Sequence, residues 1–266
     1  MAVLKTDDYL QVYGSLAGDP DLHRLSGRDD HYDLTAFINR AISESLQLTP
    51  DQSLLDIGCG DGSLLVGVRQ RIATGLGIAP TVPEIRRLQT AHSYPNISFA
   101  LGTADRLPVA DRAFDRIVIN GVLLILPDEA VVRRVLLEVK RVSRPGALVW
   151  IGEMPDCDEL AAKERYTGTS LLGFLFHKWR KKGFRKAVRK AVALLREWKK
   201  PQVFLGRRHF WMSADAFLAL CQEAELESIW WRRHREIDKH GTESESATRI
   251  DYLMRAKWPP LSAERE

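Results

Sequence analysis

The sequence predicts an α/β protein built on a doubly wound, mostly parallel sheet. Short apolar runs alternate with stretches of helical period from residue 53 to residue 151. The first run of this region leads into a glycine-rich loop at 58–62, and two further apolar runs follow near the C-terminus after a long interruption. Strands that alternate with helices are typical of parallel sheets covered on both faces.

The elements follow in chain order. Buried strands are expected at 53–57, 75–79, 97–101, 114–120 and 147–151, because each is a short apolar run bounded by turn residues. Helices are expected at 33–48 and 63–72, after the capping sequence Thr81-Val-Pro-Glu84, at 128–142, and from Ser213 to 224. Pro145-Gly146 predicts a turn, and 227–237 with 248–258 predict a late antiparallel hairpin around a loop at 239–246. The sheet should then have seven strands.

Composition limits the class of protein. The chain has 266 residues, of which 45% are hydrophobic and 28% charged, which excludes disorder, collagen and coiled coil for the whole chain. Cys59, Cys157 and Cys221 form neither a C-x-x-C pair nor a zinc-binding pattern, so no metal and a reducing compartment are expected. The first ten residues lack an apolar run, and the longest apolar stretch, 117–126, is about half of a membrane span. These features predict a cytoplasmic protein.

Positive charge is concentrated in one segment. The net charge is +4, but residues 178–200 hold eleven Lys and Arg against the single acid Glu197, which leaves the rest of the chain at −6. The expected organisation is therefore a helical cap at 1–50, a core at 51–156, a basic helical insertion over the substrate site at 157–208, and a C-terminal part at 209–266 that completes the sheet.

The glycine loop predicts a site for a nucleotide-like ligand. A strand, a glycine turn and a helix in succession bind such ligands at the carboxyl edge of an open sheet, because glycine lets the backbone approach closely. A dinucleotide fingerprint would need glycine at position 63, where this chain has Ser63, and no Gly-Lys-Ser/Thr of a P-loop follows.

The spacing Asp56-x-Gly58-x-Gly60-x-Gly62 resembles motif I of class I S-adenosylmethionine (SAM) dependent methyltransferases. Residues 102–115, 120–127 and 141–151 resemble, in the same order, the family's segments around strands three to five. The resemblance covers 50–155 well and 209–258 loosely, and it does not cover 157–208. It implies a Rossmann-like fold, SAM as cofactor and methyl transfer as the reaction.

The resemblance also implies cofactor contacts. Asp56, Gly58, Cys59 and Gly60 would face the methionine part of SAM, and Asn120 the sulfonium. The remaining contacts would surround the nucleoside: Ala104 and Asp105 by the adenine, and Ala79, Pro80, Thr81 and Thr103 in the rest of this pocket. Other interpretations stay open, since Asp56 could only organise the loop, Asn120 could only cap its strand, and Cys59 is favoured as a small packed residue.

Two departures concern the nucleoside pocket. The family usually has an acid at the end of strand two that binds the ribose hydroxyls, and here that residue is Ala79. It often has aspartate where this chain has Thr103. SAM would then bind weakly, or Thr81, Thr103 or the N-terminal segment would hold the ribose, although Thr81 could equally serve only as a helix cap. The missing acid also counts against NAD.

Candidate catalytic bases lie outside the core. An alcohol acceptor needs a base, whereas an amine, thiolate or carboxylate does not. His31, Tyr32 and His209 are the candidates, with His177 beside them, and each could instead be a surface or packed residue. Tyr9 and Tyr13 could close over SAM, and Glu153 could contact substrate. The motifs of DNA-base methylation are missing after residue 120.

The segment 171–200 combines an apolar stretch with the basic cluster. It is either a helix with solvated charges or a surface that recognises an anionic acceptor or an anionic membrane. We therefore expect methyl transfer to a small or lipid-linked, anionic acceptor by a cytoplasmic protein that binds peripherally to membranes. Nucleic acid is less favoured as a partner because no RNA-binding module surrounds the cluster. The alternatives are an RNA or protein methyltransferase, or a non-catalytic relative.

Overall fold

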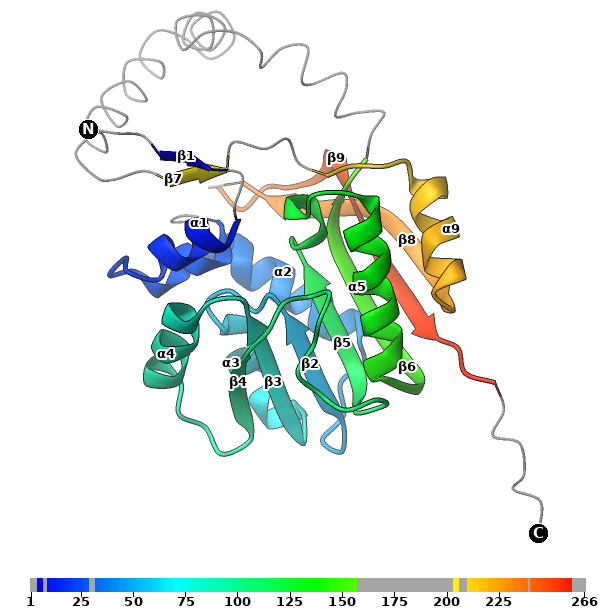
Figure 1. Ribbon diagram of the computed structural model, residues 1–266, viewed down its shortest axis with the longest axis horizontal. Coiled ribbons are helices and arrows are strands. Elements are labelled where there is room, and N and C mark those ends of the chain that lie inside the picture. The colour runs from blue at the N-terminus through cyan, green and yellow to red at the C-terminus, as the bar shows by residue number, and fades with distance from the viewer. Residues whose placement is uncertain are drawn as a thin grey trace, which may run out of the picture.

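The computed structural model describes residues 4–6, 9–28, 32–156, 203–205, 210–238 and 240–259. Its centre is a seven-stranded sheet of order β4-β3-β2-β5-β6-β9-β8 (Figure 1). The strands from β2 to β6 are parallel, and β9 runs antiparallel to both β6 and β8. The predicted seven-strand, mostly parallel sheet with a late antiparallel hairpin is confirmed. Its strands are β2 (Ser53–Ile57), β3 (Thr74–Ala79), β4 (Ile97–Leu101), β5 (Phe114–Asn120), β6 (Ser143–Pro155), β8 (Leu226–Ile237) and β9 (Glu243–Ala256).

The helices begin where the capping residues predict. Thr81, Asp128 and Ser213 each accept a hydrogen bond from the backbone N–H three residues later, which satisfies a free donor of the first turn. The helices are α1 (Tyr9–Leu16), α2 (Tyr32–Ser45), α3 (Ser63–Val68), α4 (Val82–Ala91), α5 (Glu129–Val142) and α9 (Ala214–Glu223), with 3₁₀ turns at Leu22–Ser26, Arg69–Arg71 and Leu123–Ile125.

Each face of the sheet has its own apolar core. Val135 and Val139 of α5 are fully buried on one face, together with residues of α9. Ile42 of α2 and Leu65 of α3 are buried on the other. Because the central strands are covered on both faces, they are continuous apolar runs rather than alternating ones. This packing holds the carboxyl ends of β2, β3, β5 and β6 at one edge of the sheet.

A second, two-stranded sheet was not predicted. β1 (Leu4–Thr6) pairs in parallel with β7 (Val203–Leu205). The expectations of no strand in 1–50 and none in 157–208 were therefore wrong at these residues, because three-residue strands are too short to show a period. Their pairing joins the N-terminal segment to the end of the expected insertion. The basic cluster at 178–200 lies outside the described residues.

Two predicted turns differ from the structure. Pro145-Gly146 lies within the bounds of β6, where the register with β5 shifts and Gly146 has a φ of 76°. An irregular stretch in the pairing of β6 with β5 therefore replaces the expected turn. The late hairpin loop is shorter than expected, because β9 already begins at Glu243. Among the described helices, none combines the length and apolar character needed to cross a bilayer.

Candidate active site

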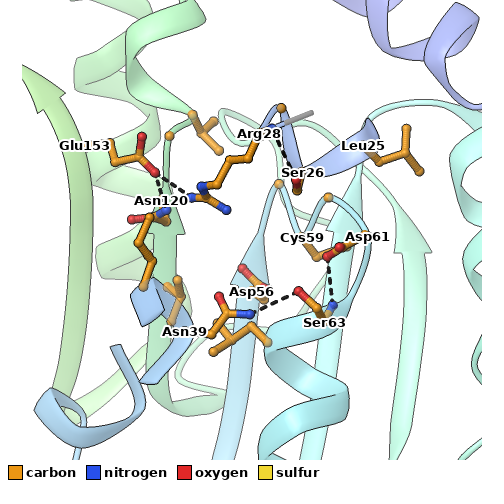
Figure 2. Close-up of a pocket in the computed structure, with 18 of the residues that line it drawn as sticks. Leu25, Ser26, Arg28, Asn39, Asp56, Cys59, Asp61, Ser63, Asn120 and Glu153 are labelled. Carbon is orange, nitrogen blue, oxygen red and sulfur yellow. Dashed lines mark hydrogen bonds and ion pairs between the residues drawn. The ribbon is translucent and has the colours of Figure 1, made fainter. Parts of the chain in front are cut away.

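A pocket lies at the carboxyl edge of the sheet, where segments far apart in the chain meet. The loop after β2, the end of β3, Asn120 of β5 and Glu153 of β6 line it, and residues 25–28 and α2 close it. Figure 2 shows side chains from these segments pointing into the same space. Ligands of open α/β sheets bind at this edge.

The glycine loop is shaped by its neighbours as well as by the pocket. Gly58, Gly60 and Gly62 have φ values of 73°, 54° and 75°, a region that favours glycine. A Cβ at Gly60 would lie 3.0 Å from the carbonyl oxygen of Leu25. The N-terminal segment therefore rests directly on the loop and encloses the pocket.

Asp56 brings a buried carboxylate to the floor of the pocket. Among the described residues, its carboxylate has no hydrogen-bond partner. Burial, together with the charge of Asp61, raises the pKa of Asp56 to about 7, although the charge of Arg28 opposes this shift. A buried, unpartnered carboxylate that faces a pocket suits a positively charged ligand group.

Glu153 lies at the centre of an ionic cluster. Arg28 and Arg249 each donate to its carboxylate at 2.5 Å, and Asn120 Nδ2 donates at 3.0 Å. Figure 2 shows the contacts of Arg28 and Asn120. Burial opposes ionisation of Glu153, but the charges of Arg28, Arg249 and His234 outweigh it and lower its pKa to about 2. Glu153 is thus a permanent anion that orients two guanidinium groups.

The backbone at Glu153 is strained. Its φ is 59°, an unusual value for a residue with a side chain, and the register between β6 and β9 shifts between Ile151 and Met154. Such strain and bulges concentrate at functional sites. The bulge turns the Glu153 side chain into the pocket.

Asn120 is held rigidly at the end of β5. Its Oδ1 accepts from Trp150 Nε1 at 3.1 Å while its Nδ2 binds Glu153. A Cβ at position 152 would collide with the Asn120 amide, so Gly152 is required there. Asn120 therefore bridges strand β6 and the arginine cluster.

One acidic and one phenolic group, Glu84 and Tyr13, line the opposite end of the pocket. Glu84, in the first turn of α4, is only 1% exposed and lines the pocket, and the Thr81 hydroxyl donates to its Oε2 at 2.6 Å. Burial raises the pKa of Glu84. Tyr13 of α1 also lines the pocket, and burial, with a contribution from the charge of Glu84, raises its pKa. The sequence pattern identified Glu84 only as part of a helix cap.

A buried histidine–aspartate pair adds to the wall formed by β8 and β9. His234 Nδ1 lies 2.9 and 3.0 Å from the two carboxylate oxygens of Asp251, and both residues are buried. His234 lines the pocket. No local motif marks either residue, so sequence reasoning missed this pair.

The structure brings together most of the predicted cofactor residues. Asp56, Gly58, Cys59, Gly60, Ala79, Pro80 and Asn120 line the pocket, as do Tyr13 and Glu153. Burial raises the pKa of the Cys59 thiol well above its usual value, which fits a packed residue rather than a nucleophile.

Other predicted residues lie elsewhere. Thr81, Thr103, Ala104 and Asp105 are not among those that line the pocket. Thr81 caps α4, Thr103 pairs with Arg106 in a turn, and Asp105 lies 3.5 Å from Arg134.

Among the predicted catalytic residues, Tyr32 is described by the structure, and it does not line the pocket. Tyr32 is exposed, donates its hydroxyl to Asp21 at 2.7 Å and stacks on His23, outside this pocket. His31, His177 and His209, and the side chain of Tyr9, lie outside the described residues.

Comparisons with known proteins agree with this geometry. Residues 54–146 match the model of a methyltransferase domain. An uncharacterised methyltransferase of Schizosaccharomyces pombe is 32% identical over 107 residues, which are 36% of this chain and 37% of that protein. The chain thus spans little more than a third of that relative's length.

Solved structures share the fold over nearly the whole chain. The N-methyltransferase NodS of Bradyrhizobium japonicum, in complex with S-adenosyl-L-homocysteine (SAH), superposes with a TM-score of 0.58 at 17% identity and covers 93% of this chain and 97% of its own. The [4+2]-cyclase SpnF superposes with a TM-score of 0.59 at 16% identity, covering 97% and 98%. At these identities the likeness shows the fold alone.

Residues 54–146 therefore form a class I methyltransferase domain, and SAM is the cofactor of such domains. The residues present fit this cofactor. Gly58 and Gly60 line the pocket with backbone alone, and the buried carboxylate of Asp56 suits the ammonium group of its methionine part. Glu84 supplies a second carboxylate to the pocket, which Ala79 also lines.

Proposed function

We propose that the protein transfers the methyl group of SAM to a small, anionic acceptor. A single feature carries the proposal: the glycine loop with Asp56 and the arginine pair Arg28 and Arg249 line the same pocket. Both reaction partners would therefore lie within reach of one another.

The chain's own residues would align the reactants. SAM supplies a methyl group that is already activated, so the protein mainly has to orient the acceptor and exclude water. The glycine loop and Asp56 hold the methionine part, and Glu84 is placed for the ribose. Residues 25–28 cover the loop and keep water out.

The charge of the far end favours an anionic acceptor. Two guanidinium groups share the one carboxylate of Glu153, so Glu153 by itself does not neutralise both of them. Arg249 is partly exposed to the pocket, so it can bind a carboxylate or phosphate in a charge-assisted, bidentate manner.

The segment 171–200 extends this proposal to lipid-linked acceptors and anionic membranes. β6, which carries Glu153, ends at Pro155 before the basic segment, and β7 begins at Val203 after it and pairs with β1. Its charge of +10 over residues 178–200 supports contact with an anionic surface.

Calorimetry with SAM tests the cofactor site through Asp56. The pKa of Asp56 is about 7, and a bound ammonium group favours the ionised carboxylate, so its pKa falls on binding. SAM binding near pH 7 should therefore release a proton, seen as a binding enthalpy that varies with the ionisation enthalpy of the buffer. Asp56→Asn should abolish this release.

An acceptor screen with labelled SAM tests the proposed class of acceptor. The panel compares small carboxylates and phosphates, lipid-linked phosphates, tRNA and protein. Arg249→Gln should raise the KM for an anionic acceptor roughly tenfold or more, the loss expected for a charge-assisted hydrogen bond. Methylation of tRNA or protein alone would replace the proposed acceptor class, and failure to bind SAM would indicate a non-catalytic relative.

A further inference from the structure

We propose that His234, oriented by Asp251, is the general base of this site, and that the acceptor group it serves is a hydroxyl. This inference rests on the proposed methyl transfer and adds the chemical class of the accepting atom.

The first support is the environment of the imidazole. His234 is 2% exposed and lines the pocket, while Asp251 is 3% exposed behind it. Both carboxylate oxygens of Asp251 lie within hydrogen-bond distance of His234 Nδ1. Among the described residues, the other ring nitrogen, Nε2, has no hydrogen-bond partner. A buried ring with one nitrogen fixed by a carboxylate and the other free is the arrangement of an oriented base.

Asp251 is itself held in place. Its Oδ1 also accepts the backbone N–H of Glu153 at 3.0 Å. Asp251 thus connects the histidine to the residue that orients Arg28 and Arg249. The base and the proposed anion-binding groups belong to one hydrogen-bonded unit.

Two irregularities of the sheet produce this arrangement. The register between β8 and β9 breaks between Arg233 and Arg235, which places His234 at the break. The register between β6 and β9 breaks at Glu153. Bulges next to active sites change the direction of a side chain, and here both breaks adjoin the pocket.

The pocket offers no better base in this wall. Glu153 has a pKa of about 2, so it cannot take a proton from an alcohol near neutral pH. Arg249 and Arg28 are cations, and Glu236, on the same strand as His234, lines the pocket without a corresponding orienting partner in the described part of the chain. His234, whose Nδ1 is held by Asp251, is the group of this wall that the geometry favours as the base.

The proposed step moves a methyl group from sulfur to oxygen. The acceptor O–H gives its proton to His234 Nε2, and the oxygen's electron pair forms the new bond to the methyl carbon. The bond between that carbon and the sulfonium sulfur breaks, and its electron pair stays on sulfur, which yields neutral SAH. The imidazolium then releases its proton to solvent.

Matched acceptors separate a base from a structural histidine. We would compare 4-hydroxybenzoate with 4-mercaptobenzoate, since both are anionic and of similar shape. The aromatic thiol ionises more readily than the thiol of cysteine, with its pKa of ~8.5, and needs no base at pH 8. His234→Gln should lower the rate with the hydroxyl compound by roughly 10²- to 10⁴-fold and leave the thiol rate unchanged.

Asp251 is a positioning residue in this proposal. Asp251→Asn should lower the same hydroxyl rate and spare the thiol rate, because the ring loses its preferred tautomer. Nitrogen NMR of labelled histidine gives an independent readout in the SAH complex: His234 should carry its proton on Nδ1 in the parent and lose this preference in Asp251→Asn. Thermal unfolding of both variants checks that they fold.

His23 provides a matched control, since it also forms a buried pair, with Asp61 at 2.8 Å, but does not line this pocket. His23→Gln should leave the ratio of hydroxyl to thiol rates unchanged.

The outcomes distinguish this inference from the proposed function. Equal loss of both rates in His234→Gln, retention of the hydroxyl rate, or a parent that accepts only the thiol would overturn the inference while methyl transfer stands. SAM binding without turnover of either compound also overturns it. A parent that binds neither SAM nor SAH would overturn the proposed function itself.

Discussion

At the scale of single residues, three carboxylates of the pocket differ in their ionisation and in their partners. Glu153 is ionised between two arginines, and Asp56 has a pKa of about 7. Glu84 is buried, and one of its oxygens accepts a hydrogen bond from the Thr81 hydroxyl. Each therefore suits a different partner: arginine, an ammonium group and a pair of hydroxyls.

Glu84→Gln tests the last of these assignments. The change keeps the shape and an acceptor for the Thr81 hydroxyl but removes the charge, so affinity for SAH should fall roughly 10- to 100-fold, as expected for a charged hydrogen bond. Calorimetry with adenosine and 2′,3′-dideoxyadenosine checks the cause, because the parent should prefer adenosine and the variant should not.

Two further variants complete this test. Glu138→Gln is the control, since Glu138 accepts from Leu107 and Arg141 away from the pocket. Ala79→Asp should restore SAH affinity to Glu84→Gln, yet bring little gain to the parent, where two neighbouring carboxylates would repel. If Glu84→Gln still distinguishes the two nucleosides, another group holds the ribose.

At the scale of elements, the N-terminal segment and the glycine loop form one wall of the pocket. Leu25 and Ser26 contact Gly60 so closely that no side chain fits between them. The loop's third glycine, Gly62, is confined instead by His92 and Phe99. Glycines in this loop thus serve packing as well as ligand approach.

Gly60→Ala should lower the stability of the protein, because it disturbs this wall of the pocket. The new Cβ would meet the Leu25 carbonyl at a φ of 54°, so stability should fall by about 1–3 kcal/mol in urea unfolding, and SAH affinity should fall because the segment is displaced. Gly67→Ala is the control, because a Cβ at Gly67 in α3 would have no atom within 4 Å. This variant should be more stable than the parent by about 0.4–1 kcal/mol and should keep its affinity for SAH. Equal affinity in both variants would contradict this role of the segment.

At the scale of the whole molecule, the basic cluster and the residues that line the pocket belong to different stretches of the sequence. The cluster at 178–200 carries +10, whereas the pocket is built by the sheet edge and the N-terminal segment. Recruitment of an anionic surface and binding of SAM should therefore be separable properties of this chain.

Reversal of four charges, at Arg185, Lys186, Arg189 and Lys190 to Glu, tests this separation. Binding to phosphatidylglycerol vesicles should be lost, because the attraction is electrostatic and is screened over a Debye length of ~8 Å at physiological salt. SAH affinity should stay as in the parent. Phosphatidylcholine vesicles and a salt series are the controls, and equal vesicle binding by both proteins would exclude a membrane role for the cluster.

The seven-stranded sheet, the helix starts and the class of cofactor could be predicted from the sequence. Apolar runs bounded by turn residues mark the buried strands, and Thr81 and Asp128 mark helix starts, because these signals are local in the chain. The glycine loop is likewise contiguous, so its ligand class could be inferred from a resemblance.

The composition of the rest of the site depends on how distant segments pack and could not be predicted from the sequence. Arg28, Glu153 and Arg249 meet from three distant segments, and His234 reaches Asp251 where the register of β8 and β9 breaks. Bulges and positive φ at a non-glycine residue depend on how neighbouring strands pack, and no spacing within one strand encodes them. A carboxylate in a helix cap, such as Glu84, becomes a pocket residue only because the cofactor edge of the sheet lies beside it.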